Sequence, residues 1–169
     1  MTDETRPPGI VIGQIFLERA QFGHREDALL LPPNTQLGEP QLLFTFEGGV
    51  APDDKTGFVR VTVQSKPDER PLYNIDVTMI ALVQTQKGQE NMPLRDYVRT
   101  AAPTMLYPFL REVVANLTWR GRFGPLWLVP MNVAAATAGA IREVAPPTSK
   151  VLPRIRRSKK AKKRMKARR

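Results

Sequence analysis

The stretch LYPFLREVVANLTWRGRFGPLWLVP, residues 106–130, reads as an amphipathic helix that gives way to an irregular apolar segment. Pro108 is tolerated only in the first turn of a helix, so the helix is expected to begin between Thr104 and Tyr107. Gly121 suits the left-handed position that ends a helix. The helical spacing brings one apolar face together, which consists of Leu106, Phe109, Leu110, Val113, Val114 and Leu117.

The second half of this stretch, FGPLWLVP at residues 123–130, combines large apolar side chains with two prolines. Neither a helix nor a paired strand extends far between such prolines. The apolar side chains either close the core or form an exposed surface, and full burial would be worth about 1.5–3 kcal/mol for each of them. Both interpretations stay open for Leu126 and Leu128.

Four strands are predicted upstream of this helix. The first, IVIGQIFLERAQF at residues 10–22, is rich in β-branched and aromatic residues. In the next three, apolar and polar residues alternate, which is typical of antiparallel strands that cover a core on one side only. These three are QLLFTFEG at residues 41–48, GFVRVTVQS at 57–65 and PLYNIDVTMIALVQ at 71–84. The connectors between them are turn-like and short enough for a meander.

Helices are predicted for the rest of the globular part. Residues 93–102 are expected to form a short helix that stops before Pro103. A last helix is expected to begin at Asn132, a suitable N-cap, and to run until Pro146. Strands followed by helices indicate an α+β fold: a four-stranded antiparallel sheet with a long helix and a second C-terminal helix packed on one face.

The composition excludes several kinds of chemistry. The chain of 169 residues has no cysteine, one histidine (His24) and three serines, so zinc ligands and a Ser–His–acid constellation lack members. We therefore expect a non-enzyme without metal or cofactor, and we interpret His24 as an ordinary solvated side chain. The lack of cysteine, of a signal-peptide pattern and of an apolar run of about 18 residues favours a cytosolic protein.

The net charge of +10 comes from one end of the chain. Residues 150–169 hold 12 Lys or Arg and no acid, whereas residues 1–149 carry 14 basic and 16 acidic residues. We expect a disordered lead-in at residues 1–9, one domain at 10–145, and a proline-bounded linker with a disordered basic tail at 146–169. Such a tail attracts RNA, the ribosome or an anionic membrane through phosphate contacts. The candidate contact residues are Arg154, Arg156, Arg157, Lys159, Lys160, Lys162, Lys163 and Arg164.

The helix and the segment after it carry a recognisable pattern. It starts with aromatic–Pro–aromatic, continues with Arg–Glu and an Arg–Gly–x–Phe stop, and leaves through Leu–x–Leu–x–Pro–x–Asn. The residues are Tyr107, Pro108, Phe109, Arg111, Glu112, Arg120, Gly121, Phe123, Leu126, Leu128, Pro130 and Asn132. This pattern resembles that of the bacterial export chaperone family SecB. The order of the predicted strands and the long first connection match as well, so the resemblance spans roughly residues 10–142.

The resemblance implies a homotetramer, a dimer of dimers, with helices sandwiched between two outer sheets. It also implies an ATP-independent holdase that binds unfolded precursor polypeptides in apolar grooves and delivers them to the SecA motor. Trp127 replaces the polar residue that is common at its position, which favours a groove wall or a subunit contact. The predicted groove residues are Leu29, Leu30, Leu31, Phe123, Leu126, Trp127, Leu128 and Met131.

Two features separate this chain from the family pattern. The family docks SecA through acidic residues, but Arg19 and Gly23 stand at two of these positions and only Asp76 matches. The altered local charge opposes docking of a basic partner.

The second feature is the basic tail, which supports an alternative: a nucleic-acid- or ribosome-binding protein that keeps a SecB-like body as a scaffold. Because some SecB-like relatives guard an antitoxin, a chaperone dedicated to an antitoxin is a third hypothesis.

Overall fold

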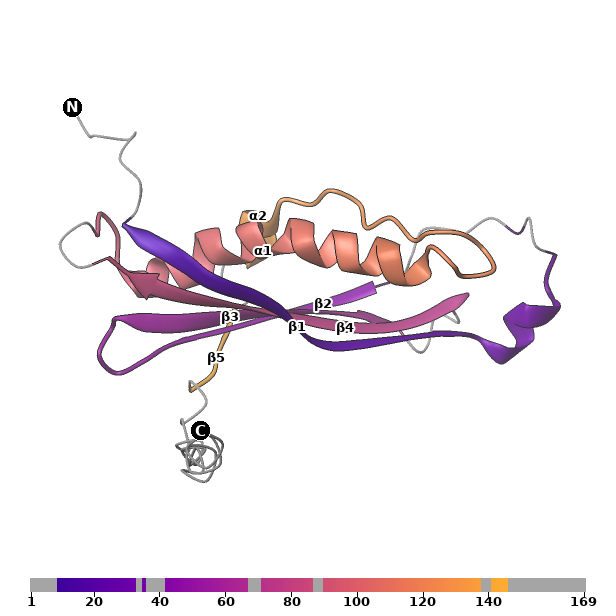
Figure 1. Ribbon diagram of the computed structural model, residues 1–169, viewed down its shortest axis with the longest axis horizontal. Coiled ribbons are helices and arrows are strands. Elements are labelled where there is room, and N and C mark those ends of the chain that lie inside the picture. The colour runs from indigo at the N-terminus through magenta and orange to yellow at the C-terminus, as the bar shows by residue number, and fades with distance from the viewer. Residues whose placement is uncertain are drawn as a thin grey trace, which may run out of the picture.

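The computed structural model describes residues 9–32, 35, 42–66, 71–86, 90–137 and 141–145. These residues form one sheet with a long helix across one of its faces (Figure 1). The predicted lead-in, apart from Gly9, and the predicted basic tail lie outside the described residues. The polyanion-binding prediction therefore concerns a part of the chain that the structure does not describe.

The sheet has five strands in the order β1-β4-β3-β2-β5. Four of them lie where the sequence predicts strands and pair antiparallel: β1 Ile10–His24, β2 Leu42–Val50, β3 Thr56–Ser65 and β4 Tyr73–Thr85. The apolar residues of the alternating strands form the face of the sheet that the helix covers. In β3 these are Val59, Val61 and Val63, which are fully buried in the core cluster beneath the helix. The α+β prediction and the meander of β2, β3 and β4 are confirmed.

A single helix, α1 Leu94–Thr118, replaces the two helices that the sequence predicts. Pro103 and Pro108 both lie inside it, so Pro108 does not mark its first turn. Each internal proline costs about 3 kcal/mol or more. The offsetting interaction is a buried stripe that recurs at every fourth residue and crosses both prolines without a break. The stripe consists of Val98, Ala102, Leu106, Leu110, Val114 and Thr118. No helix in the described ranges is long and apolar enough to cross a membrane.

The end of α1 also differs from the expectation. Gly121 does not adopt the left-handed conformation; the glycine with positive φ after this helix is Gly124, at 80°. Gly121 instead permits a close approach, because a Cβ atom there would clash with the Tyr73 hydroxyl and would lie 2.9 Å from the Thr118 carbonyl oxygen. The Gly121 N–H donates to that same carbonyl at 2.8 Å, which turns the chain immediately after the helix.

The predicted last helix is shorter than expected. Asn132 is an N-cap as predicted, since its Oδ1 accepts the Ala135 N–H at 3.0 Å. The helix, α2 Val133–Thr137, has five residues, and the chain then forms β5 Arg142–Glu143 in parallel with β2. These residues leave the helical path because the edge of β2 is open to pairing. The Gly48 carbonyl at that edge accepts the Val144 N–H at 3.0 Å. The long C-terminal helix is therefore a wrong prediction, and the sheet gains a fifth strand.

Alkaline pH is expected to destabilise the fold through its tyrosines. Burial raises the pKa of Tyr73, Tyr97 and Tyr107, the three tyrosines of the chain. The unfolded chain therefore ionises first, near pH ~10, so this stabilisation is complete below that pH and is lost as the pH rises above it. The urea midpoint should stay level from pH 8 to about 9.5 and fall above pH ~10.

The control for this prediction is Tyr97→Phe. Within the part of the chain that the structure describes, the Tyr97 hydroxyl bonds to the Met105 sulfur alone, at 3.2 Å, so removal of this hydroxyl should cost little at neutral pH. The variant should lose less stability than the wild type between pH 10 and 11. An identical loss in both proteins would show that these tyrosines do not cause it.

Candidate functional site

The segment from residue 119 to residue 132, here called the return segment, runs back along α1 (Figure 1). Three side chains of α1 hold it through its backbone. The Thr118 hydroxyl accepts the Leu126 N–H at 2.8 Å, the Arg111 Nε donates to the Leu128 carbonyl at 2.9 Å, and the Tyr107 hydroxyl donates to the Val129 carbonyl at 2.6 Å. Backbone groups between two prolines thus find their partners on the helix instead of in a strand.

These bonds give the return segment two faces. Leu126 and Leu128 are 6% and 1% exposed, whereas Trp127 and Val129 are 62% and 66% exposed. The sequence leaves open whether the two leucines close the core or form an exposed surface, and the structure shows that they close the core. They are therefore corrected from groove residues to core residues within this chain. Trp127 stands on the surface, as expected for a wall or contact residue.

An aromatic cluster anchors the beginning of the return segment. The rings of Phe22, His24, Tyr73 and Phe123 meet at centroid distances of 5.2–6.2 Å. The Tyr73 hydroxyl accepts the Phe123 N–H and donates to the Gly124 carbonyl, each at 2.8 Å. His24 is half-buried in this cluster, so the prediction of an ordinary solvated side chain is wrong.

The predicted groove residues on the first long connection lie at this same end of the molecule. The short 3-10 helix η1, Glu26–Leu30, leaves Leu29 and Leu30 51% and 89% exposed. Arg122 joins the two segments, because its Nη2 donates to the Leu31 carbonyl at 2.9 Å and its N–H donates to His24 Nε2 at 3.0 Å. The structure thus brings the segment of Leu31 to the return segment near Phe123.

Not all the predicted groove residues meet. Trp127 and the half-buried Met131 follow further along the return segment, towards α2. The groove prediction therefore divides into two places: one between η1 and the start of the return segment, and one beside the middle of α1.

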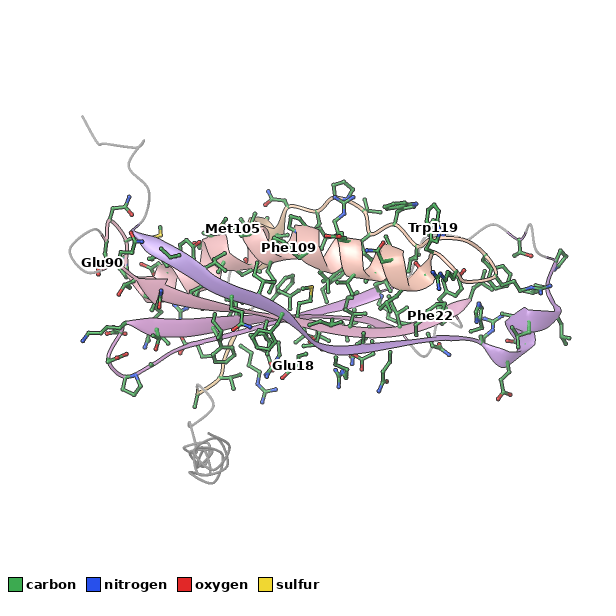
Figure 2. The ribbon with its side chains drawn as sticks, viewed as in Figure 1. Glu18, Phe22, Glu90, Met105, Phe109 and Trp119 are labelled. Carbon is green, nitrogen blue, oxygen red and sulfur yellow. The ribbon has the colours of Figure 1, made fainter. Side chains whose placement is uncertain are left out.

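The helix itself adds exposed apolar side chains, of which Phe109 and Trp119 were not predicted from the sequence. Met105, Phe109 and Trp119 are 51%, 44% and 65% exposed and lie along α1 and its end (Figure 2). The helical spacing in the sequence predicts Phe109 on the buried face, but the buried stripe advances by four residues at each step and leaves this ring at its margin. The sequence did contain a sign of this stripe, because Ala102, Leu106 and Leu110 follow one another at a spacing of four residues.

The face of the sheet away from α1, here called the outer face, carries paired charges. Asp76, the predicted docking carboxylate, has Oδ1 2.9 Å from Arg19 Nη2, and its Oδ2 accepts from Gln64 at 3.1 Å. The Arg19 contact is an ion pair without the alignment of a hydrogen bond. Arg19 thus compensates the charge of the single matching family carboxylate.

A second charged group on the outer face is centred on Arg60. Its guanidinium binds both oxygens of Glu18 at 2.9 Å and Glu47 at 3.1 Å, and Figure 2 shows Glu18 on the side of the sheet away from α1. The hydrogen bond to Glu18 is the main reason that the pKa of Arg60 is raised. Both carboxylates are therefore engaged within the chain.

The fold and these surfaces define a class: an α+β protein in which a sheet supports a helix and a return segment that present apolar side chains outward. Within the described ranges no three His, Cys, Asp or Glu side chains gather as a metal site.

The chain belongs to the SecB family. The family model described as preprotein translocase subunit SecB matches residues 39–142. The protein-export protein SecB of Acidithiobacillus ferrooxidans is 40% identical over 76 residues, which are 44% of this chain and 50% of the relative. That of Acinetobacter baumannii is 30% identical over 104 residues, which are 60% of this chain and 68% of the relative. The chain thus spans half the length of the first relative and about two thirds of the second.

A solved structure has the same fold. It is the SecB-like chaperone Rv1957 of Mycobacterium tuberculosis in complex with a ChAD peptide from the HigA1 antitoxin. The similarity covers 76% of this chain and 89% of that chain, with 25% identity and a TM-score of 0.55. The predicted SecB-like fold is therefore confirmed.

Proposed function

We propose that this protein is an ATP-independent chaperone, a holdase, which binds unfolded segments of precursor polypeptides in the cytosol and keeps them export-competent. The observation that carries this proposal is the exposure of large apolar side chains on two adjoining parts of the molecule. Met105 and Phe109 on α1 and Trp127 and Val129 on the return segment are 44–66% exposed. The Tyr107–Val129 and Arg111–Leu128 hydrogen bonds hold these two parts together, and a monomeric protein rarely exposes a large continuous apolar surface. Membership in the SecB family supports the same conclusion.

The physical chemistry explains why no nucleotide is needed. Contact with apolar side chains of an unfolded client removes apolar area from water, which stabilises the complex by about 25 cal/mol for each Å². Such contacts depend on area and not on client sequence, so one surface serves many clients. Met105 adds an unbranched thioether side chain that adapts to different neighbours.

We further propose a homotetramer, a dimer of dimers, as the working assembly. Several copies of a weak surface held together bind one long client far more tightly than a single copy does. Among these exposed side chains we assign Phe109 to assembly, and we assign Met105, Trp127 and the Leu29–Leu30 pair to client binding. Light scattering should therefore respond to Phe109→Ala, and client binding should respond to Trp127→Ala.

The proposal is tested with a permanently unfolded polypeptide at moderate salt. Trp127→Ala should weaken its binding about fivefold to tenfold, the loss expected for an aromatic anchor of an interface. The matched control is Leu43→Ala, since Leu43 is 51% exposed but lies on the outer face of β2. This control should bind within twofold of the wild type. Equal affinities for all three proteins would remove the return segment from the client site.

The same assay separates the holdase from a tail-based function. The full chain and residues 1–149 should bind the unfolded polypeptide equally well if the body holds clients. If only the full chain binds, and the signal vanishes as salt rises, the basic tail is the working part. Tail removal is also expected to lower co-sedimentation with ribosomes or RNA at low salt.

Delivery to SecA is the part of the family function with the least support in this chain. The outer-face carboxylates Glu18, Glu47 and Asp76 are all paired with arginines of the same chain. We infer that a basic docking partner finds little free negative charge there. Arg19→Glu should restore such charge and strengthen SecA binding in a pull-down. Strong binding by the wild type would contradict the inference.

A chaperone dedicated to an antitoxin is the second candidate. One observation favours it: the solved SecB-like chaperone of similar fold holds a peptide from an antitoxin. A dedicated chaperone should bind one antitoxin segment at least a hundredfold more tightly than an unrelated unfolded polypeptide. Comparable affinities would leave the general holdase as the function.

A further inference from the structure

The arginines of the described ranges differ in whether a carboxylate neutralises their charge. Those that form an ion pair with a carboxylate are Arg19, Arg25, Arg60, Arg95 and Arg99. Those without such a pair among the described residues are Arg111, Arg120, Arg122 and Arg142. All of the latter except Arg142 lie in the second half of α1 or on the return segment. Uncompensated positive charge therefore collects near the side chains that the proposed function assigns to clients.

Neutral carbonyl groups hold two of these guanidinium groups in place. The Arg111 Nε donates to the Leu128 carbonyl at 2.9 Å. The Arg122 Nη2 donates to the Leu31 carbonyl, also at 2.9 Å. A guanidinium has five N–H donors, so each of these bonds fixes the side chain and leaves further donors for another acceptor. The Arg120 side chain is exposed and makes no hydrogen bond or ion pair with the other described residues. All three side chains thus keep their positive charge.

Each of these cations neighbours an exposed apolar side chain. The carbonyl that Arg111 binds belongs to Leu128, the residue that follows the exposed Trp127. Arg120 directly follows Trp119, which is exposed at the end of α1 (Figure 2). Aromatic rings and positive charge therefore occur together on both sides of the turn after α1.

The third pair lies where η1 meets the return segment. Arg122 binds the Leu31 carbonyl, and the preceding Leu30 is strongly exposed. Two carboxylates on η1 and α1, Glu26 and Glu112, are also exposed and form no ion pair with a described residue. They lower the net charge of this end of the molecule without neutralising a particular guanidinium.

The client surface is here defined by three apolar–cationic pairs: Trp127 with Arg111, Trp119 with Arg120, and Leu30 with Arg122. A carboxylate accepts two parallel N–H bonds from a guanidinium, which are stronger and more specific than bonds between neutral groups. In an extended segment successive side chains are about 3.3 Å apart, so carboxylates can reach the cations while their apolar neighbours cover the rings. The apolar contacts exclude water, which strengthens the adjacent charge pairs. A basic segment instead meets like charge.

We propose that the client surface selects unfolded segments in which aspartate or glutamate is interspersed with aromatic and aliphatic residues, and that it disfavours basic segments. Arg111, Arg120 and Arg122 bind the carboxylates, and the two tryptophans and Leu30 bind the apolar side chains. This inference rests on the proposed holdase function and names the class of client. The preference is local, because residues 1–149 as a whole carry 16 acidic and 14 basic residues.

Three unfolded peptides test this preference on the full-length protein. They share the same phenylalanine and leucine residues, contain no tryptophan, and carry glutamate, glutamine or lysine at the intervening positions. The chain has two tryptophans, Trp119 and Trp127, and both belong to the client surface, so a change in their emission reports binding there. A peptide held only by the basic tail should leave this emission unchanged.

The glutamate peptide should bind about fivefold to tenfold more tightly than the glutamine peptide, because several individually weak ion pairs add up. The lysine peptide should bind more weakly than both, and the differences should narrow as the salt concentration rises. Equal affinities of the three peptides would overturn the inferred client class and leave the holdase function in place. If none of the three changed the emission, the proposed holdase function itself would be contradicted.

A charge reversal identifies the surface that is responsible. Arg120→Glu should weaken binding of the glutamate peptide about threefold to fivefold and strengthen that of the lysine peptide, because an attractive pair becomes a repulsive one. The matched control is Arg142→Glu, since Arg142 is also exposed and without an ion pair in the described ranges, but lies on β5. The Glu143–Arg99 ion pair places β5 beside the start of α1, and about 20 residues of helix, or about 30 Å, separate Arg99 from Arg120.

The control variant has the same tail and the same change in net charge as Arg120→Glu. It should therefore bind all three peptides within twofold of the wild type. Equal shifts in the two variants would show that the net charge of the chain sets the preference, which would overturn the assignment to the client surface.

Discussion

Replacing Leu110 with alanine will lower the free energy of unfolding by about 2–5 kcal/mol, the range found for buried leucines. Leu110 is fully buried in the middle of the stripe with which α1 contacts the sheet. Its removal takes away apolar contacts and leaves a cavity that a helix constrained on both sides cannot close. Urea unfolding followed by tryptophan fluorescence measures the loss, since Trp119 and Trp127 both report on the end of α1 and the return segment.

The matched control is the neighbouring residue on the same helix. Phe109 is 44% exposed, so Phe109→Ala should cost about 1 kcal/mol or less in the monomer, and alanine is the better helix former. The difference between the two variants should shrink at high protein concentration if assembly buries Phe109. Equal losses for both variants at low concentration would contradict the placement of these two side chains.

Replacing Thr118 with valine will cost about 1–3 kcal/mol, because the change leaves a buried backbone N–H without a partner. Thr118 is fully buried, and its hydroxyl donates to the Val114 carbonyl at 2.8 Å while it accepts the Leu126 N–H at 2.8 Å. Valine has nearly the same shape, so the loss comes from the hydrogen bond and not from packing. Hydrogen exchange should rise at the Leu126 and Trp127 amides, where the return segment would separate from α1.

Thr100→Val is the control for this second prediction. Thr100 lies on the same helix and donates to the Asp96 carbonyl at 2.8 Å, but it is exposed and its hydroxyl accepts no N–H from another of the described segments. Its replacement should change the stability by less than about 0.5 kcal/mol, as at most surface sites. If Thr118→Val were as mild as the control, the hydroxyl would not be what holds the return segment.

The strands could be predicted well from the sequence, and the helices less well. In β3, valines alternate with Arg60, Thr62 and Gln64, and the fold buries the valines completely. The helix prediction was wrong at Pro103 and Pro108. A local rule ends a helix before a proline or begins one there, whereas α1 runs through both residues. Packing of residues on both sides of each proline against one sheet outweighs that rule.

The candidate site was predicted in part. The return segment was singled out by its composition, and the exposure of Trp127 agrees with a wall or contact residue. Its two leucines could not be assigned, because the segment has no regular hydrogen-bonding pattern of its own. Phe109 was missed as a surface residue because an apolar residue near the margin of a helical stripe has the same local pattern on either side.

By itself the sequence determined the features that repeat over short distances: four strands with one apolar face, an amphipathic helix and an apolar segment between two prolines. Only the tertiary structure decided which side of that segment is exposed, because Tyr107, Arg111 and Thr118 supply its hydrogen-bond partners from another element. It also decided that residues after α2 join the sheet, because the edge that receives them belongs to β2, far away in the chain. Hydrogen-bond partners and packing surfaces of this kind are contributed by distant residues, and no local pattern contains them.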